Sequence, residues 1–182
     1  MGQIRITGGL HRSRKIKVED QPGLRPTADR VRETLFSWLG QNLSDKSVLD
    51  LYAGSGILAI EAASRGATEI TCVENNRQTR VQLQKNIDLL GLSQIKVIQQ
   101  NARDFIKASQ VAYDILFLDP PFDSDEMNAI NDIITPLVKA GGLVYREYAT
   151  SQEIVPLSDD HWERIKYKKA GQVIFELWHK TA

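Results

Sequence analysis

The spacing of apolar residues divides most of this chain into alternating strands and helices. From residue 47 onward, short apolar runs alternate with amphipathic segments, which is typical of a doubly wound parallel sheet in an α/β fold. We expect strands at 47–51, 69–74, 95–99, 113–119 and 142–148. Helices are predicted between them at about 57–65, 76–90, 102–109 and 124–138. Near the end, 162–167 and 172–178 alternate around Ala170-Gly171, which predicts a C-terminal antiparallel hairpin.

The first part of the chain follows a different pattern. Residues 3–7 and 15–18 flank Gly8-Gly9 and predict a short hairpin with basic outward positions. Thr27 is a suitable N-cap for a following helix. Its expected apolar stripe, at helical spacing, comprises Val31, Leu35, Trp38 and Leu39. We therefore expect an N-terminal extension over 1–45 and a main domain over 46–182.

Charge is distributed unevenly, although the composition is that of an ordinary single domain. The 182 residues are 42% hydrophobic and carry no net charge. Residues 1–32, however, hold eight Lys/Arg and three Asp/Glu, so that this segment is +5 and the remainder −5. A basic arm on an acidic body predicts a polyanionic partner, and a solvated charged face is the alternative.

Several other functions find no support in the composition. No apolar run approaches the roughly 18–20 residues of a membrane span, and the start lacks the apolar core of a signal peptide. The single cysteine, Cys72, lies in a predicted buried strand, where core packing is expected. Three scattered histidines and one cysteine provide no metal-ligand cluster. We expect a cytoplasmic protein without a metal.

The apolar run 113–118 ends abruptly at Asp119-Pro120-Pro121-Phe122. Two prolines cannot donate to a sheet ladder, so Asp119 is expected at a strand's carboxyl end, where open α/β sheets bind ligands. The Asp119 carboxylate and the Pro120 carbonyl could each accept one N–H of a planar –NH2 group. Phe122 could stack on the attached ring. The alternative is an acidic strand end, a proline turn and a core phenylalanine.

A second candidate site follows the first predicted strand. Gly54 and Gly56 let the backbone approach a ligand, and the next helix presents free N–H groups. The same residues satisfy the dinucleotide fingerprint, so the glycines alone leave NAD and other nucleoside cofactors open. Asp50 suits an ammonium group better than a pyrophosphate, and Glu74 ends the second strand where an acid can accept ribose hydroxyls. These two acids favour S-adenosylmethionine.

These motifs resemble class I, seven-stranded amino-methyltransferases. Residues 25–33 (Arg-Pro-Thr-Ala-Asp-Arg-Val-Arg-Glu), 50–56, 64–67 (Ser-Arg-Gly-Ala) and 169–173 (Lys-Ala-Gly-Gln-Val) together resemble the bacterial 16S ribosomal RNA guanine-N2 methyltransferase D family. The match runs nearly end to end. Its most specific part is 25–33, because Asp-Pro-Pro-Phe also occurs in adenine-N6, cytosine-N4 and glutamine-N5 methyltransferases.

The resemblance implies a Rossmann-like seven-stranded sheet, S-adenosylmethionine as cofactor, and methylation of a guanine N2 in the 16S rRNA of the small (30S) subunit or its assembly intermediate. The expected catalytic residues are Asp119, Pro120, Pro121 and Phe122. The expected cofactor residues are Asp50, Tyr52, Ala53, Gly54, Ser55, Gly56, Glu74, Asn75, Asn101, Ala102 and Asp119. The expected RNA contacts are Arg5, Arg12, Arg14, Lys15, Arg25, Thr27, Arg30 and Arg32.

Three other functions stay open at the level of sequence. The first is amino-methylation of adenine N6 or cytosine N4, because the Asp119 motif would hold any exocyclic amine. A guanine enzyme needs a further acceptor for N1–H, for which Asp123 and Asp125 are candidates. The second is a non-catalytic RNA-binding assembly factor, and the third is an NAD oxidoreductase. We expect a monomer.

Overall fold

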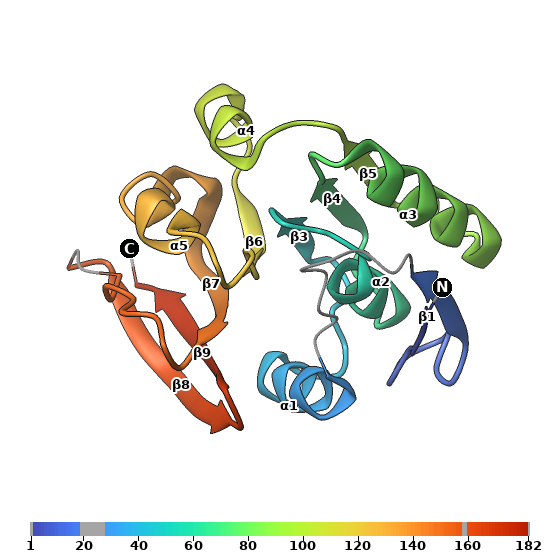
Figure 1. The fold of residues 1–182 in the computed structure, drawn as a ribbon, viewed down its shortest axis with the longest axis horizontal. Coiled ribbons are helices and arrows are strands. Elements are labelled where there is room, and N and C mark those ends of the chain that lie inside the picture. Colours follow the sequence, from blue (N-terminus) through green and yellow to red (C-terminus); the bar gives the residue numbers. More distant parts are fainter. Residues whose placement is uncertain (1, 19–27, 158–159, 182) are drawn as a thin grey trace.

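The structure is a computed structural model that describes residues 2–18, 28–157 and 160–181 (Figure 1). Its strands are β1 (Gly2–Arg5), β2 (Lys15–Val18), β3 (Ser47–Asp50), β4 (Glu69–Val73), β5 (Ile95–Ile98), β6 (Tyr113–Leu118), β7 (Val138–Ala149), β8 (Trp162–Ala170) and β9 (Val173–Lys180). Its helices are α1 (Asp29–Leu39), α2 (Ile57–Ser64), α3 (Arg77–Leu90), α4 (Ala102–Ala108) and α5 (Glu126–Ile130), with a 3₁₀ turn at Thr135–Leu137.

Seven strands form one sheet in the order β5-β4-β3-β6-β7-β9-β8. The first five strands in this order are parallel, and β9 and β8 add an antiparallel hairpin at one edge. The strand order reverses between β3 and β6, and open α/β sheets bind ligands beyond the carboxyl ends of strands at such a point. The seven-stranded α/β architecture predicted from the sequence is therefore confirmed.

Alternate strand residues face two separate cores. Val48 of β3 belongs to the core beneath α2 and α3, whereas its neighbour Leu49 belongs to the core beneath α4 and α5. This alternation follows from the two-residue period of a strand. It explains why β3 is buried at all four positions and carries no polar outward face.

The N-terminal extension packs into the first of these cores. Ile4 and Ile16 of the β1–β2 hairpin, together with Leu35 and Phe36 of α1, are buried among residues of the main sheet and α2. Figure 1 shows the hairpin and α1 on the side of the sheet that carries α2 and α3. The predicted hairpin and helix are thus present, and they share the core of the domain that follows.

Two local predictions were wrong. The predicted helix over 124–138 is only five residues long, and Pro136 lies in a separate 3₁₀ turn that the chain forms before entering β7. Strand β7 accordingly starts at Val138 instead of 142.

In α1 the N-cap is Ala28, which makes no side-chain cap bond, and the proposed cap Thr27 lies outside the described residues.

The buried stripe of α1 also differs from the prediction. Arg32 and Phe36 are buried with Val31 and Leu35, whereas Trp38 and Leu39 are only partly buried. The stripe therefore includes a charged residue.

Candidate active site

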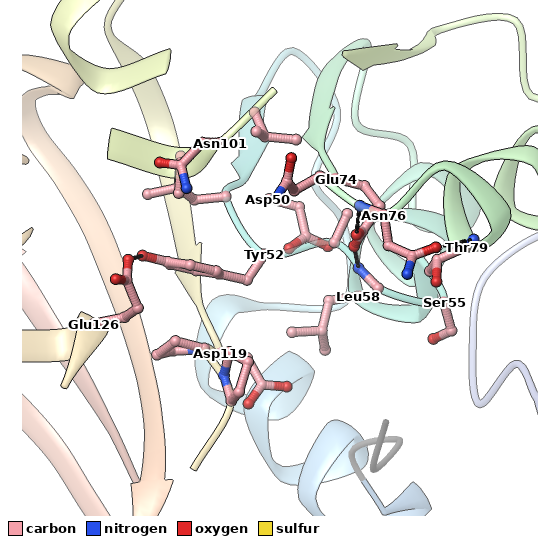
Figure 2. Close-up of a pocket in the computed structure, with 18 of the residues that line it drawn as sticks. Asp50, Tyr52, Ser55, Leu58, Glu74, Asn76, Thr79, Asn101, Asp119 and Glu126 are labelled. Carbon is pink, nitrogen blue, oxygen red and sulfur yellow. Dashed lines mark hydrogen bonds between the residues drawn. The ribbon is translucent and has the colours of Figure 1, made fainter. Parts of the chain in front are cut away.

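The ends of β3, β4 and β6 enclose a cavity of about 660 Å³. This volume lies within the roughly 300–1,000 Å³ of typical small-molecule pockets. Parallel strands end at the same edge of a sheet, so Asp50, Glu74 and Asp119 all line this cavity. Figure 2 shows Asn101 and Asp119 on opposite sides of the pocket, with Tyr52 between them in this view.

Glu74 fixes the glycine loop that follows β3. Its carboxylate accepts the backbone N–H of Gly54 at 2.9 Å and that of Asn76 at 2.7 Å, as the dashed lines in Figure 2 mark. Gly54 has φ 51°, a left-handed conformation that favours glycine. Glu74 therefore links the loop after β3 to the start of α3, and both segments line the cavity.

Asp50 is buried in the floor of the cavity. Burial raises the pKa of its carboxyl group to about 7, with the nearby Glu74 charge adding to the shift and backbone N–H groups of Ala59 and Tyr52 opposing it. Its Oδ2 atom is buried and has no hydrogen-bond partner among the described residues. A buried acceptor of this kind is costly unless a ligand satisfies it, and a cationic donor satisfies it best.

The side of the cavity next to α4 is closed by three linked side chains. The Tyr52 hydroxyl donates to Glu126 Oε2 at 3.0 Å, and the Arg103 guanidinium contacts Glu126 Oε1 at 2.6 Å. Burial and the Glu126 carboxylate raise the pKa of Tyr52 far above its ordinary range, so the phenol stays protonated. Asn101 is the N-cap of α4 and accepts the Arg103 N–H at 2.9 Å. This cluster connects β3, α4 and α5 beside the cavity.

Asp119 lies at the open side of the cavity, directly after β6. Pro120 is buried, Pro121 is exposed and Phe122 is half-buried, and all three line the cavity. The Ser124 hydroxyl donates to the Pro121 carbonyl at 2.7 Å, which fixes the turn after the prolines. The motif thus presents a carboxylate and a ring at one mouth of the pocket.

Nearly all the predicted catalytic and cofactor residues line this one cavity. The exception is Gly56, which has φ 75° and packs so closely on α3 that a Cβ atom would collide with Leu83. Gly56 therefore shapes the turn and does not line the cavity. Among residues that the sequence analysis did not assign to the site, the cavity is also lined by Leu51, Ile57, Leu58, Val73, Asn76, Thr79, Gln100 and Glu126. Of the two candidate guanine readers, Asp123 lines the cavity, whereas Asp125 accepts from Asn128 Nδ2 at 3.3 Å.

The basic arm is largely exposed, with one exception. Arg12, Arg14, Lys15 and Arg30 are exposed, and Arg5 is half-exposed while it pairs with Asp29 at 3.0 Å. Arg25 and Thr27 lie outside the described residues.

Arg32 was wrongly predicted as an RNA contact. Its side chain is 1% exposed and pairs with the fully buried Glu61 at 3.2 Å and with Asp29 at 2.7 Å. A side chain buried in this way cannot reach a phosphate, and its position instead joins α1 to α2.

Comparisons with known proteins agree with this geometry. The family described as conserved hypothetical protein 95 matches residues 4–179. The ribosomal RNA small subunit methyltransferase D of Escherichia coli (strain K12) is 40% identical over 186 residues, covering 100% of this chain and 92% of the relative. The protein of the same name from Haemophilus influenzae is 39% identical, covering 97% of this chain and 94% of the relative. The chain belongs to the ribosomal RNA small subunit methyltransferase D family.

The solved structures agree with this assignment. The Escherichia coli protein yhhF superposes with a TM-score of 0.87 at 36% identity, covering 98% of each chain. Members of the methyltransferase D family are enzymes, and this chain has the class I methyltransferase fold. No group of three or more His, Cys, Asp or Glu side chains that could hold a metal occurs in the described ranges. No helix of the described part of the chain has the length and apolar character needed to cross a bilayer.

Proposed function

We propose that this protein transfers the methyl group of S-adenosylmethionine to the exocyclic N2 amine of a guanine in the 16S rRNA of the small ribosomal subunit. The observation that carries the proposal is the single cavity that joins Asp50 and Glu74 to Asp119-Pro-Pro-Phe122. At one end of this cavity, Asp50 and Glu74 would accept hydrogen bonds from the ammonium group and the ribose of the cofactor. At the other end, Asp119 and the Pro120 carbonyl would accept hydrogen bonds from the substrate amine. Membership of the methyltransferase D family supports the same reaction.

The residues present fit the cofactor. The unsatisfied Asp50 Oδ2 would accept from the methionine ammonium, and this pairing would stabilise the ionised carboxylate. Glu74 already accepts two backbone N–H groups, and its remaining acceptor capacity suits ribose hydroxyls. Asn101 and Ala102, at the start of α4, would bind the adenine edge. When bound, the cofactor supplies an electrophilic methyl group.

Asp119 and Pro120 would orient the substrate amine. The carboxylate and the Pro120 carbonyl each accept one N–H, which favours pyramidal geometry at nitrogen and directs its lone pair toward the methyl group. Phe122 stacks on the base. Positioning of this kind contributes roughly 7–11 kcal/mol to catalysis. Positive charge that develops on the amine lies beside Asp119, which adds electrostatic stabilisation.

The RNA partner would contact the exposed basic arm. Arg12, Arg14, Lys15 and Arg30 provide charges for phosphates without carrying base specificity. The guanine must leave its stack to enter the cavity. We propose that the substrate is the small subunit or its assembly intermediate, that the enzyme acts as a monomer, and that it works in the cytoplasm.

The test compares wild type with Asp119→Ala for methyl incorporation into small ribosomal subunits and for S-adenosylhomocysteine binding. We expect the variant to lose transfer and to keep its cofactor affinity, because Asp119 serves the amine. Radioactive methyl counting and calorimetry give the two readouts. Comparable losses of both would show that Asp119 binds the cofactor, the second role that the resemblance implies for it, and a wild type without incorporation would favour the non-catalytic assembly factor.

A further inference from the structure

Strand β8 carries a second basic surface, which is separate from the basic arm formed by residues 1–32. Its sequence, Trp-Glu-Arg-Ile-Lys-Tyr-Lys-Lys-Ala, holds four Lys/Arg and one acid, and Arg164 to Lys169 are all exposed. Two large apolar side chains, Ile165 and Tyr167, are 40% and 51% exposed among these charges. β8 is also the last strand of the sheet, so its outer edge is unpaired with another strand of the described chain.

The strand register sets the distance of this surface from Asp119. Leu118 pairs with Arg146, so Asp119 and Glu147 follow at the same level of the sheet. Glu147 pairs with Phe175, and Phe175 pairs with Lys168. Three strand spacings of about 4.8 Å each separate Asp119 from Lys168, or about 14 Å. Lys168 therefore lies at the carboxyl edge of the sheet that holds the active site.

Two lysines of β8, Lys166 and Lys168, share a face with the basic arm, whereas Lys169 points to the opposite face. Cross-strand partners point to the same side of a sheet, and Lys166 and Lys168 pair with Leu177 and Phe175. Both partners belong to the core that includes the N-terminal hairpin, and Phe175 stacks on Trp38 of α1 at 5.1 Å. The hairpin and β8 thus lie on one face of the sheet, with α1 between them, and Figure 1 shows the β8–β9 turn beside α1.

The tip of this hairpin is held in place. Gly171 turns the chain at φ 61°, and the Gln172 carbonyl accepts the Thr150 N–H at 2.9 Å. The Thr150 hydroxyl and Gln172 Oε1 are also 3.1 Å apart. These hydrogen bonds hold the turn against the end of β7. They thereby fix the position of the backbone next to Lys168 and Lys169.

We propose that the exposed surface of β8 is a second RNA-contacting surface, which binds the phosphate backbone beside the nucleotide received by Asp119. The charge of its lysines complements the RNA backbone. The inference rests on the proposed function, because RNA is the polyanion that an enzyme of this kind must hold at that edge. A protective role of lysines on an edge strand is the competing explanation.

The test uses the triple variant Lys166→Gln/Lys168→Gln/Lys169→Gln. The matched control is Lys46→Gln/Lys96→Gln/Lys107→Gln, which removes the same charge from exposed lysines before β3, on β5 and on α4. Binding of purified small ribosomal subunits is measured over a range of salt concentrations, together with S-adenosylhomocysteine affinity and light scattering. We expect the plot of log affinity against log salt to be less steep for the β8 variant, with a slope smaller by up to about two. Each lost single-strand phosphate contact reduces the slope by about 0.7, and the variant removes three lysines.

We also expect a higher KM for subunits, an unchanged kcat and unchanged cofactor affinity, with the control close to wild type. Equal losses in both triple variants would show a general charge effect and overturn the proposal. Unchanged binding would also overturn it, and increased scattering in that case would assign the lysines to edge protection. The binding readout does not depend on which base is methylated, so failure here is distinct from failure of the guanine N2 assignment.

Discussion

Asp50 is the residue whose electrostatics most directly indicate a cationic ligand. Its carboxyl group has a pKa of about 7 in the folded protein, mainly because it is buried. Between about pH 4 and about pH 7 the folded state therefore holds one proton more at this position than the unfolded state. The contribution of Asp50 to the free energy of unfolding falls as pH rises through this window, by up to about 1.4 kcal/mol per pH unit.

We predict that Asp50→Asn raises the stability of the ligand-free protein relative to wild type, increasingly from about pH 4 to about pH 7. Urea unfolding at several pH values measures the difference. In wild type, cofactor binding should release a proton below about pH 7, because the ammonium favours ionised Asp50, and the variant should bind more weakly without this release. A stability difference that is independent of pH would contradict the raised pKa.

Glu74 has a structural task beside its expected ligand contact. Because it accepts the N–H groups of Gly54 and Asn76, its removal leaves two loop donors without their acceptor. We predict that Glu74→Ala weakens S-adenosylhomocysteine binding by roughly 1–3 kcal/mol. Glu69→Ala, an exposed acid at the other end of β4, is the control and should bind as wild type does. Calorimetry on both variants decides, and unchanged affinity in Glu74→Ala would exclude Glu74 from the site.

At the scale of elements, a buried ionic cluster joins the N-terminal extension to the main domain. Glu61 of α2 accepts the Thr7 N–H at 2.7 Å and pairs with Arg32 and Arg65. The Arg32 guanidinium also donates to the Arg5 carbonyl at 2.6 Å, so β1, α1 and α2 meet at one carboxylate. Arg65 additionally stacks on Phe36 at 4.1 Å. Residues 64–67, singled out by the sequence, thus contribute to this junction.

We predict that Arg32→Met lowers the free energy of unfolding by about 3–5 kcal/mol, because it leaves the buried Glu61 carboxylate without one of its partners. Arg30→Met, on the exposed side of the same helix, should change stability by less than about 0.5 kcal/mol. Urea unfolding of both variants makes the comparison. Loss of subunit binding without loss of stability in Arg32→Met would return Arg32 to the RNA surface.

Most elements could be predicted because apolar runs and breakers coincide with them. β6 ends where Asp119-Pro120 begins, and α2 follows directly on the glycine turn. The helix expected over 124–138 failed because one apolar pattern spans two elements, α5, which ends at Ile130, and the 3₁₀ turn that contains Pro136. The burial of Arg32 was missed because arginine usually stays exposed. Its spacing of three and four residues before Leu35 and Phe36 was the available signal.

The active site was predictable to the extent that its residues end strands. Asp50, Glu74 and Asp119 follow β-strand patterns, and parallel topology brings such positions together. Glu126 was missed because it lies in a short helix without a motif, and only the fold places it against Tyr52. Gly56 does not line the cavity, which the sequence could not show because a glycine needed for ligand approach and one needed for close packing look alike.

At the scale of the whole molecule, cofactor and substrate are expected at neighbouring parts of the sheet. In the proposed function, the part of the cavity beside β3, β4 and β5 would hold the cofactor, whereas Asp119 after β6 would face the substrate. The basic hairpin and two lysines of β8, Lys166 and Lys168, lie on one face, on either side of α1. Although the net charge is zero, the positive side chains are concentrated on the surface where we expect RNA to bind.

Nucleoside analysis tests the identity of the methylated group most directly. Small ribosomal subunits are methylated in vitro with S-adenosylmethionine, and the RNA is digested to nucleosides and analysed by mass spectrometry against an Asp119→Ala control. We predict N2-methylguanosine in the wild-type reaction and none above background with the variant. Detection of N6-methyladenosine or N4-methylcytidine in place of N2-methylguanosine would contradict the guanine assignment.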